Sequence, residues 1–98
     1  MNKRRWVLIG HKRKTEFFHQ MIPEDALSGL EMILLLQRLA SRHLQPHEIV
    51  AASLAKTAAG YRSELEVRRS ASGQFSLVTD TSIWKYEAKL VIYDHSKI

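Results

Sequence analysis

The chain has 98 residues, 45% of them hydrophobic and 26% charged, which fits a single globular domain covering residues 1–98. It contains no cysteine, which excludes disulfides, thiolate chemistry and cysteine-ligated zinc and leads us to expect a cytoplasmic protein stabilised by packing. Fifteen Lys and Arg against ten Asp and Glu give a formal charge of +5, which favours anionic partners.

The first predicted element is a strand from Trp6 to Ile9. Its aromatic, β-branched and aliphatic residues favour a strand that is apolar on both faces and lies inside a sheet. This run is too short for the apolar core of a signal peptide. The run Met32 to Leu36 is likewise far shorter than the roughly 20 residues that span a bilayer, so no membrane span is expected.

Residues 15–22 allow two interpretations. The spacing of a helical stripe fits Phe17, Phe18, Met21 and Ile22. The alternation of a strand fits Phe17, His19 and Met21 equally well. The sequence therefore leaves open whether the first strand is followed by a helix or forms half of a β-hairpin.

Two central helices are predicted next. Pro23–Asp25 favours a helix start, because proline suits the first helical turn and carboxylates suit its positive end, and an apolar stripe continues to about Arg42. Pro46 cannot continue that helix, so a second helix is expected from Pro46 to about Ala59. Gly60 suits the position just after its last residue.

After Gly60 the apolar period changes from three or four residues to two. Leu65 and Val67 alternate with charged residues, and similar runs at 75–79 and 84–92 predict three antiparallel strands joined by short turns. The expected fold is therefore α+β, with an N-terminal strand or hairpin, two central helices and a C-terminal three-stranded antiparallel meander, the helices packed on one face of the sheet. The opposite face is expected to present these side chains to water: Arg62, Glu64, Glu66, Arg68, Lys85, Glu87 and Lys89.

Motifs for metal and phosphate binding are incomplete. His43 and His47 have the spacing of two metal ligands on a helix, but Pro46 interrupts the helix between them. The segment from Gly10 to Thr15 ends like a phosphate-binding loop, yet Arg13 stands where such a loop needs a glycine. No catalytic triad or carboxylate pair can be assigned from spacing. The sequence therefore predicts neither a metal site nor a cofactor.

A dense basic cluster lies near the N-terminus, where six of the fifteen Lys and Arg fall within the first fourteen residues. Such cations can bind a nucleic-acid backbone, and a tryptophan among them can stack on a base. The alternative is a charged terminus and turn that contact only water. The candidate nucleic-acid-binding residues of this segment are Arg4, Arg5, Trp6, Lys12, Arg13 and Lys14.

Short segments across the chain follow the pattern of a known family. Ile22–Asp25 ahead of a leucine-rich helix, Glu64–Arg68, Gly73–Val78 and Lys89–Tyr93 together resemble the second helix and the last strands of the RelE/HigB/ParE-type bacterial toxins. Members that cleave messenger RNA on the ribosome use basic residues of the sheet to orient the phosphate while the 2′-hydroxyl attacks. The resemblance thus implies a small basic domain that acts on RNA.

The same resemblance implies particular site residues. Arg68, Tyr93 and His95 become the candidate catalytic residues, and Arg69 and Lys89 further candidates for holding RNA. Ser76 stands where the middle strand of the family usually carries an arginine. We therefore do not expect robust catalysis.

Three functional hypotheses follow. The first is an accessory domain without catalytic machinery that binds a macromolecular anionic partner, RNA or the ribosome above all, through its basic end and its sheet. The second is a ribosome-dependent mRNA endoribonuclease of the toxin type. The third is a protein-interaction module or homodimer that uses the second helix or an exposed sheet edge.

Overall fold

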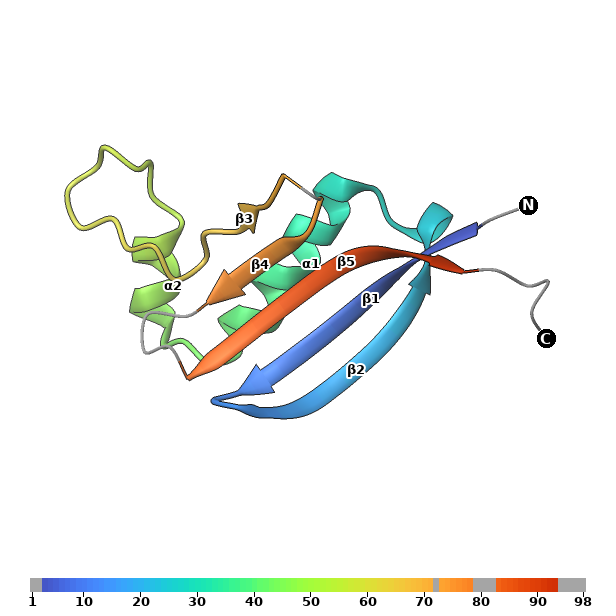
Figure 1. The fold of residues 1–98 in the computed structure, drawn as a ribbon. Coiled ribbons are helices and arrows are strands. Elements are labelled where there is room, and N and C mark those ends of the chain that lie inside the picture. Colours follow the sequence, from blue (N-terminus) through green and yellow to red (C-terminus); the bar gives the residue numbers. More distant parts are fainter. Residues whose placement is uncertain (1–2, 72, 79–82, 94–98) are drawn as a thin grey trace.

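The protein combines a five-stranded antiparallel sheet with two helices in a computed structural model that describes residues 3–71, 73–78 and 83–93 (Figure 1). The strand order across the sheet is β2-β1-β5-β4-β3. The α+β class predicted above is therefore correct. Among the described residues no helix is long and apolar enough to cross a membrane. The elements in chain order are β1 (Lys3–Lys12), β2 (Thr15–Pro23), a 3₁₀ turn (Glu24–Ala26), α1 (Gly29–Ser41), α2 (Pro46–Ala52), β3 (Arg68–Arg69), β4 (Phe75–Val78) and β5 (Trp84–Tyr93).

The N-terminal segment is a β-hairpin, which decides between the two interpretations of residues 15–22. β1 pairs with β2 on one side and with β5 on the other, so the prediction of an interior strand is confirmed. The register of β1 and β2 shifts between Gly10 and His11, which leaves Phe17 as the extra residue of a bulge. A Cβ atom at Gly10 would come within 3.0 Å of the rings of Phe17 and Tyr86, so the hairpin needs glycine there.

Helix α1 begins six residues after Pro23, where the sequence led us to expect the helix start. Ser28 is its N-cap: the Ser28 hydroxyl accepts the Glu31 backbone N–H at 3.1 Å, and the Glu31 carboxylate accepts the Ser28 backbone N–H at 3.0 Å. Pro23 instead ends β2. The reciprocal cap at Ser28 satisfies two backbone donors, and this favours the later start.

Helix α2 is shorter than predicted and ends at Ala52 instead of Ala59. Two of the apolar side chains expected to anchor the longer helix remain at the surface, since Val50 in α2 is 64% exposed and Leu54 beyond its end is 40% exposed. A short helix gains most of its stability from burying such a stripe, so nothing holds a longer one together. Gly60 has a positive φ of 85° but lies in the loop beyond the helix.

The first strand of the predicted meander is also shorter, because only Arg68 and Arg69 pair with β4. Glu64 and Leu65 lie in the loop before it, and both are buried. The expectation that Glu64 faces water is therefore wrong. The turn between β3 and β4 is described in part, with the Ser70 N–H donating to the Gln74 carbonyl at 2.8 Å. The predicted turn at 80–82 lies outside the described residues.

Helix α1 lies against one face of the sheet (Figure 1), and the core side chains fill the space between them. Met32, Leu36 and Ala40 recur every four residues along α1 and are fully buried. From the sheet and its loop come Trp6, Leu8, Leu65, Phe75, Tyr86 and Ala88. No described helix lies on the other face of the sheet, which we call the uncovered face.

Candidate nucleic-acid interface and the pocket on the opposite face

The strand register assigns every paired residue to one face of the sheet, because residues directly opposite each other point the same way. One row crosses all five strands through His19, Ile9, Glu87, Ser76 and Arg68. The core residue Ala88 follows Glu87 in β5 and points to the helices, so this row lies on the uncovered face. Arg68 therefore reaches the face that no described helix covers.

Lys89 lies two residues after Glu87 and so points to the same face as Arg68. Both side chains are exposed, and neither pairs with a carboxylate among the described residues. Lys85 differs, because its ammonium lies 2.6 Å from a Glu87 carboxylate oxygen. The Gln74 amide also donates a hydrogen bond to that carboxylate at 2.9 Å. The carboxylate of Glu87 is therefore already paired with Lys85 and Gln74.

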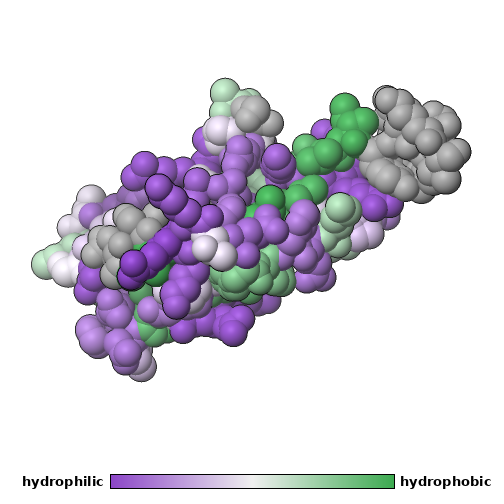
Figure 2. All heavy atoms as spheres, turned by 60° about the horizontal axis from the view of Figure 1, so that its bottom comes forward, coloured by the Kyte–Doolittle hydropathy of each residue, from purple (hydrophilic) through white to green (hydrophobic). Residues whose placement is uncertain are grey.

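The described charged residues of the uncovered face are more often cationic than anionic. Apolar residues of β1, β2 and β5 lie between the charges, and Met21 and Val91 are 56% and 38% exposed. Figure 2, which turns the lower edge of Figure 1 forward, shows hydrophilic side chains over most of the visible surface, with hydrophobic ones in separate patches. The cations are Arg5, Arg68, Lys85 and Lys89, and the carboxylates Glu16 and Glu87.

The structure separates the N-terminal basic cluster into two groups. Arg4 and Arg5 lie at one end of β1, and Lys12 lies at the other, next to the hairpin turn of Arg13 and Lys14. Arg4 and Lys12 are about eight positions apart in an extended strand, which corresponds to roughly 26 Å. A cluster that is dense in the sequence is therefore not one patch in space.

The turn residues are exposed but are held by the sheet. Arg13 has a positive φ of 58°, and its backbone N–H donates to the Ile83 carbonyl at 2.6 Å. The ammonium of Lys12 lies 5.3 Å from the ring centroid of Trp84. This group forms a basic tip at the far end of the hairpin.

Trp6 is 3% exposed and belongs to the core, not to a binding surface. Its indole N–H donates to the Leu27 carbonyl at 3.0 Å, and its ring packs against Phe75 with 5.8 Å between centroids. Trp6 also borders the pocket described below, but a ring that is 3% exposed and packed on Phe75 offers no open face to a base, so the stacking role expected for Trp6 does not fit its position.

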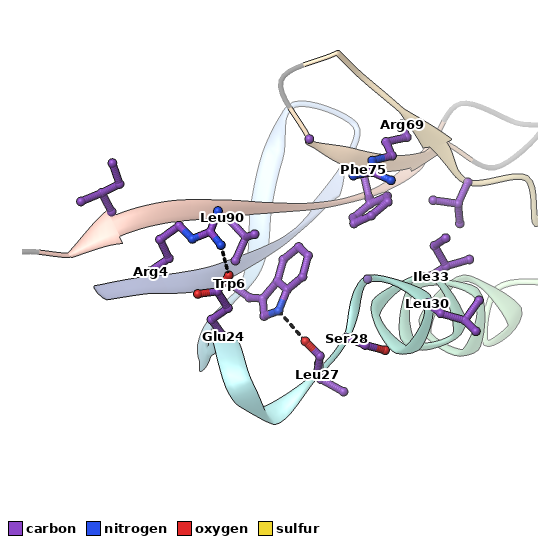
Figure 3. A pocket seen from close by; sticks show the side chains of 14 residues that line it. Arg4, Trp6, Glu24, Leu27, Ser28, Leu30, Ile33, Arg69, Phe75 and Leu90 are labelled. Carbon is purple, nitrogen blue, oxygen red and sulfur yellow. Dashed lines mark hydrogen bonds and ion pairs between the residues drawn. The ribbon is translucent and has the colours of Figure 1, made fainter. Parts of the chain in front are cut away.

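Arg4 and Arg69 lie on the side of the helices, where they line a pocket of about 830 Å³ (Figure 3). The carboxylate of Glu24 pairs with Arg4, and the guanidinium of Arg69 lies 5.3 Å from the ring centroid of Phe75. The walls are the underside of the sheet and the start of α1. The apolar lining includes Leu27, Leu30, Ile33, Val67, Leu90 and Ile92.

Arg68 and Arg69 are neighbours in sequence but serve opposite faces. Arg69 is opposite Phe75, which faces the helices, whereas Arg68 is opposite Ser76 on the uncovered face. A single flat surface cannot receive both side chains. Arg68 and Arg69 therefore cannot hold RNA together on one surface, although the sequence led us to expect this.

A cluster of aromatic rings near the C-terminal end of α1 was not anticipated from the sequence. The imidazole of His43 stacks on Trp84 with 3.7 Å between centroids and an angle of 6°, and it hydrogen-bonds the hydroxyl of Tyr86. Phe17 meets Trp84 and Tyr86 edge-on. The sequence gives no sign of this cluster, because its members are far apart in the chain and come from β2, β5 and the segment after α1.

Burial shifts the pKa of both titratable residues of this cluster, His43 and Tyr86. Desolvation, reinforced by the positive charge of Arg42, lowers the pKa of His43 below its usual 6.5. Desolvation raises the pKa of Tyr86 above 10.0. Both groups are therefore neutral near pH 7, which suits a packing role. No group of three His, Asp or Glu within the described residues could hold a metal ion.

The candidate catalytic residues do not assemble into a site that the structure describes. Arg68 lies on the uncovered face, Tyr93 is the last residue of β5, and His95 lies outside the described residues. Comparison with known proteins assigns no role to these residues, because no family model, curated protein or solved structure matches the chain.

Proposed function

We propose that this chain binds single-stranded RNA through the uncovered face of its sheet, without catalysing a reaction on it. The observation that carries the proposal is the pair Arg68 and Lys89, two exposed cations on one face that have no carboxylate partner among the described residues. Such cations can neutralise phosphates at little cost, because no ion pair with another described residue has to be broken.

The surface suits a flexible single strand of RNA better than a DNA duplex. Readers of the DNA major groove insert a helix whose side chains include cations. Helix α2 contains no Lys or Arg, and α1 contains only Arg38. A sheet face with separated cations and exposed apolar residues instead suits a chain whose phosphates can adjust to it.

The electrostatic contribution to RNA affinity should be modest and should depend strongly on the salt concentration. The described side chains of the face include four cations, Arg5, Arg68, Lys85 and Lys89, which correspond to about four phosphate contacts. For a single strand, each contact contributes a slope of roughly −0.7 in a plot of log K against log salt. The steepest slope expected from this face is therefore about −3.

The test measures binding of a fluorescent single-stranded RNA oligonucleotide by anisotropy over a series of salt concentrations. The double variant Arg68→Ala with Lys89→Ala removes both unpaired cations and should make the slope shallower by about 1.4. The matched control, Arg38→Ala with Lys56→Ala, removes the same net charge from α1 and from the loop after α2, outside the sheet.

Equal losses in the two double variants would show that only net charge matters and would refute the uncovered face as the site. Binding that does not change with salt would refute the RNA proposal itself. Cleavage of the RNA in the same assay, abolished by Arg68→Ala, would instead support the endoribonuclease hypothesis.

A further inference from the structure

The two edges of the sheet differ in how they are protected. An edge strand leaves a row of backbone N–H and C=O groups unpaired, and proteins protect such rows with short strands, charges, bulges or proline. The edge strand β3 has only two residues, and both are exposed arginines. The edge strand β2 has nine residues and no Lys or Arg, in a chain with a formal charge of +5.

The protective features of β2 are confined to its two ends. The bulge at Phe17 interrupts one end of the strand, and Pro23 closes the other. Between them the residues Phe18–Ile22 pair continuously with β1, from Gly10 opposite Phe18 to Trp6 opposite Ile22. This regular stretch carries no Asp, Glu, Lys or Arg, so its outer edge is open to another strand.

The regular stretch complements itself. An antiparallel pairing centred on Gln20 places Phe18 opposite Ile22 of a second copy and His19 opposite Met21 of a second copy. Phe18 and Ile22 both pack against the core on the side of the helices, whereas His19 and Met21 lie on the uncovered face. On the side of the helices Phe18 therefore meets the apolar Ile22, on the uncovered face His19 meets Met21, and no Lys or Arg faces another in this stretch.

We propose that β2 pairs edge to edge with β2 of a second copy of this chain, about a twofold axis at Gln20. The pairing joins two five-stranded sheets into one, with α1 of both copies on the same side and the uncovered faces continuous on the other. The contact between two single strands is small, so the dimer forms and dissociates with concentration. This proposal does not depend on RNA binding.

Sedimentation equilibrium of the full chain without RNA tests the pairing over concentrations from about 10 μM to about 1 mM. The average mass should rise from 11.3 kDa towards twice that value. Gln20→Lys and Gln20→Glu each place two like charges opposite each other at the axis, and each should weaken dimerisation at least about tenfold. An equimolar mixture of the two variants should restore association.

Thr57→Lys is the matched control, because it adds the same charge at an exposed loop position away from β2. It should dimerise like the wild type. Circular dichroism and a thermal midpoint verify that each variant is folded. A wild type that stays monomeric throughout, a Gln20→Lys variant that dimerises normally, or a mixture that fails to associate would each overturn the proposal.

Discussion

Replacing Arg62 by alanine should destabilise the fold far more than loss of a surface cation, because Arg62 neutralises a buried carboxylate. The side chain of Glu64 is only 1% exposed, and its ion pair is with the guanidinium of Arg62. No other described group donates a hydrogen bond to either of its carboxylate oxygens. Arg62 also lies 3.6 Å from Glu48 in α2, so it links this loop to the helix.

The stability lost in Arg62→Ala should lie between the loss for an exposed ion pair and the loss for a fully buried one. Exposed ion pairs contribute about 0–1 kcal/mol, whereas removing one partner of a buried pair costs about 3–5 kcal/mol. Arg62 is 39% exposed, so water screens part of the interaction. We therefore expect Arg62→Ala to lower the free energy of unfolding by about 2–3 kcal/mol.

Urea unfolding followed by circular dichroism measures this change. With a slope near 1 kcal/mol per molar urea, the midpoint should fall by about 2–3 M. In a Glu64→Gln background the same substitution should cost at least about 1.5 kcal/mol less, because no buried charge is left unpaired. Arg38→Ala serves as the exposed control. A loss below about 0.5 kcal/mol for Arg62→Ala, or an equal loss in both backgrounds, would refute the reasoning.

Two further predictions follow from the cap and the aromatic cluster. Ser28→Ala should lower the free energy of unfolding by about 0.5–2 kcal/mol in the same assay, while Pro23→Ala should change it by less than about 0.5 kcal/mol, because Ser28 and not Pro23 caps α1. The pKa of His43 is lowered in the folded state, so the unfolded chain binds the proton more readily. This contribution to stability is complete above pH 6.5 and is lost as the pH falls through the folded pKa, and His43→Gln should make the decline of the unfolding midpoint between about pH 7 and 5 shallower.

The parts of the fold that could be predicted are those in which the local pattern coincides with burial. Strand β5 spans Trp84–Tyr93, close to the predicted 84–92, because Tyr86 and Ala88 are buried while Lys85 and Lys89 face water. The alternation at 64–68 has the same period but does not produce a strand of that length. The partner strand β4 offers only Phe75 and Ser76 to β3, and the sequence of one strand cannot show the length of its partner.

The start of α1 was within reach of sequence reasoning. Ser28 and Glu31 have the spacing of a capping box directly before an apolar run, but the proline and carboxylates at Pro23–Asp25 gave an equally familiar signal. The structure uses both in succession, since Glu24–Ala26 forms one 3₁₀ turn before the helix begins. Two local signals of similar strength cannot be ranked without the tertiary contacts around them.

The candidate site was harder to predict, since a strand distributes neighbouring residues over a large distance and over two faces. Arg68 and Arg69 look like one basic motif, yet alternation directs one to the uncovered face and the other to the pocket. The ion pair of Arg62 with Glu64 depends on a loop, and the contact of His43 with Trp84 joins residues far apart in the chain. Neither arrangement has a sequence signal of its own.

The two proposals use different atoms of the same sheet, and this makes them compatible. RNA would contact side chains of the uncovered face, whereas a second copy would contact the backbone edge of β2, which carries no Lys or Arg. The charges that favour RNA therefore do not oppose the pairing at its centre. Pairing would place twice as many cations on one continuous face, so the dependence of RNA affinity on salt should become steeper as the chain dimerises. In Gln20→Lys that steepening with protein concentration should be absent, although each monomer keeps its own uncovered face.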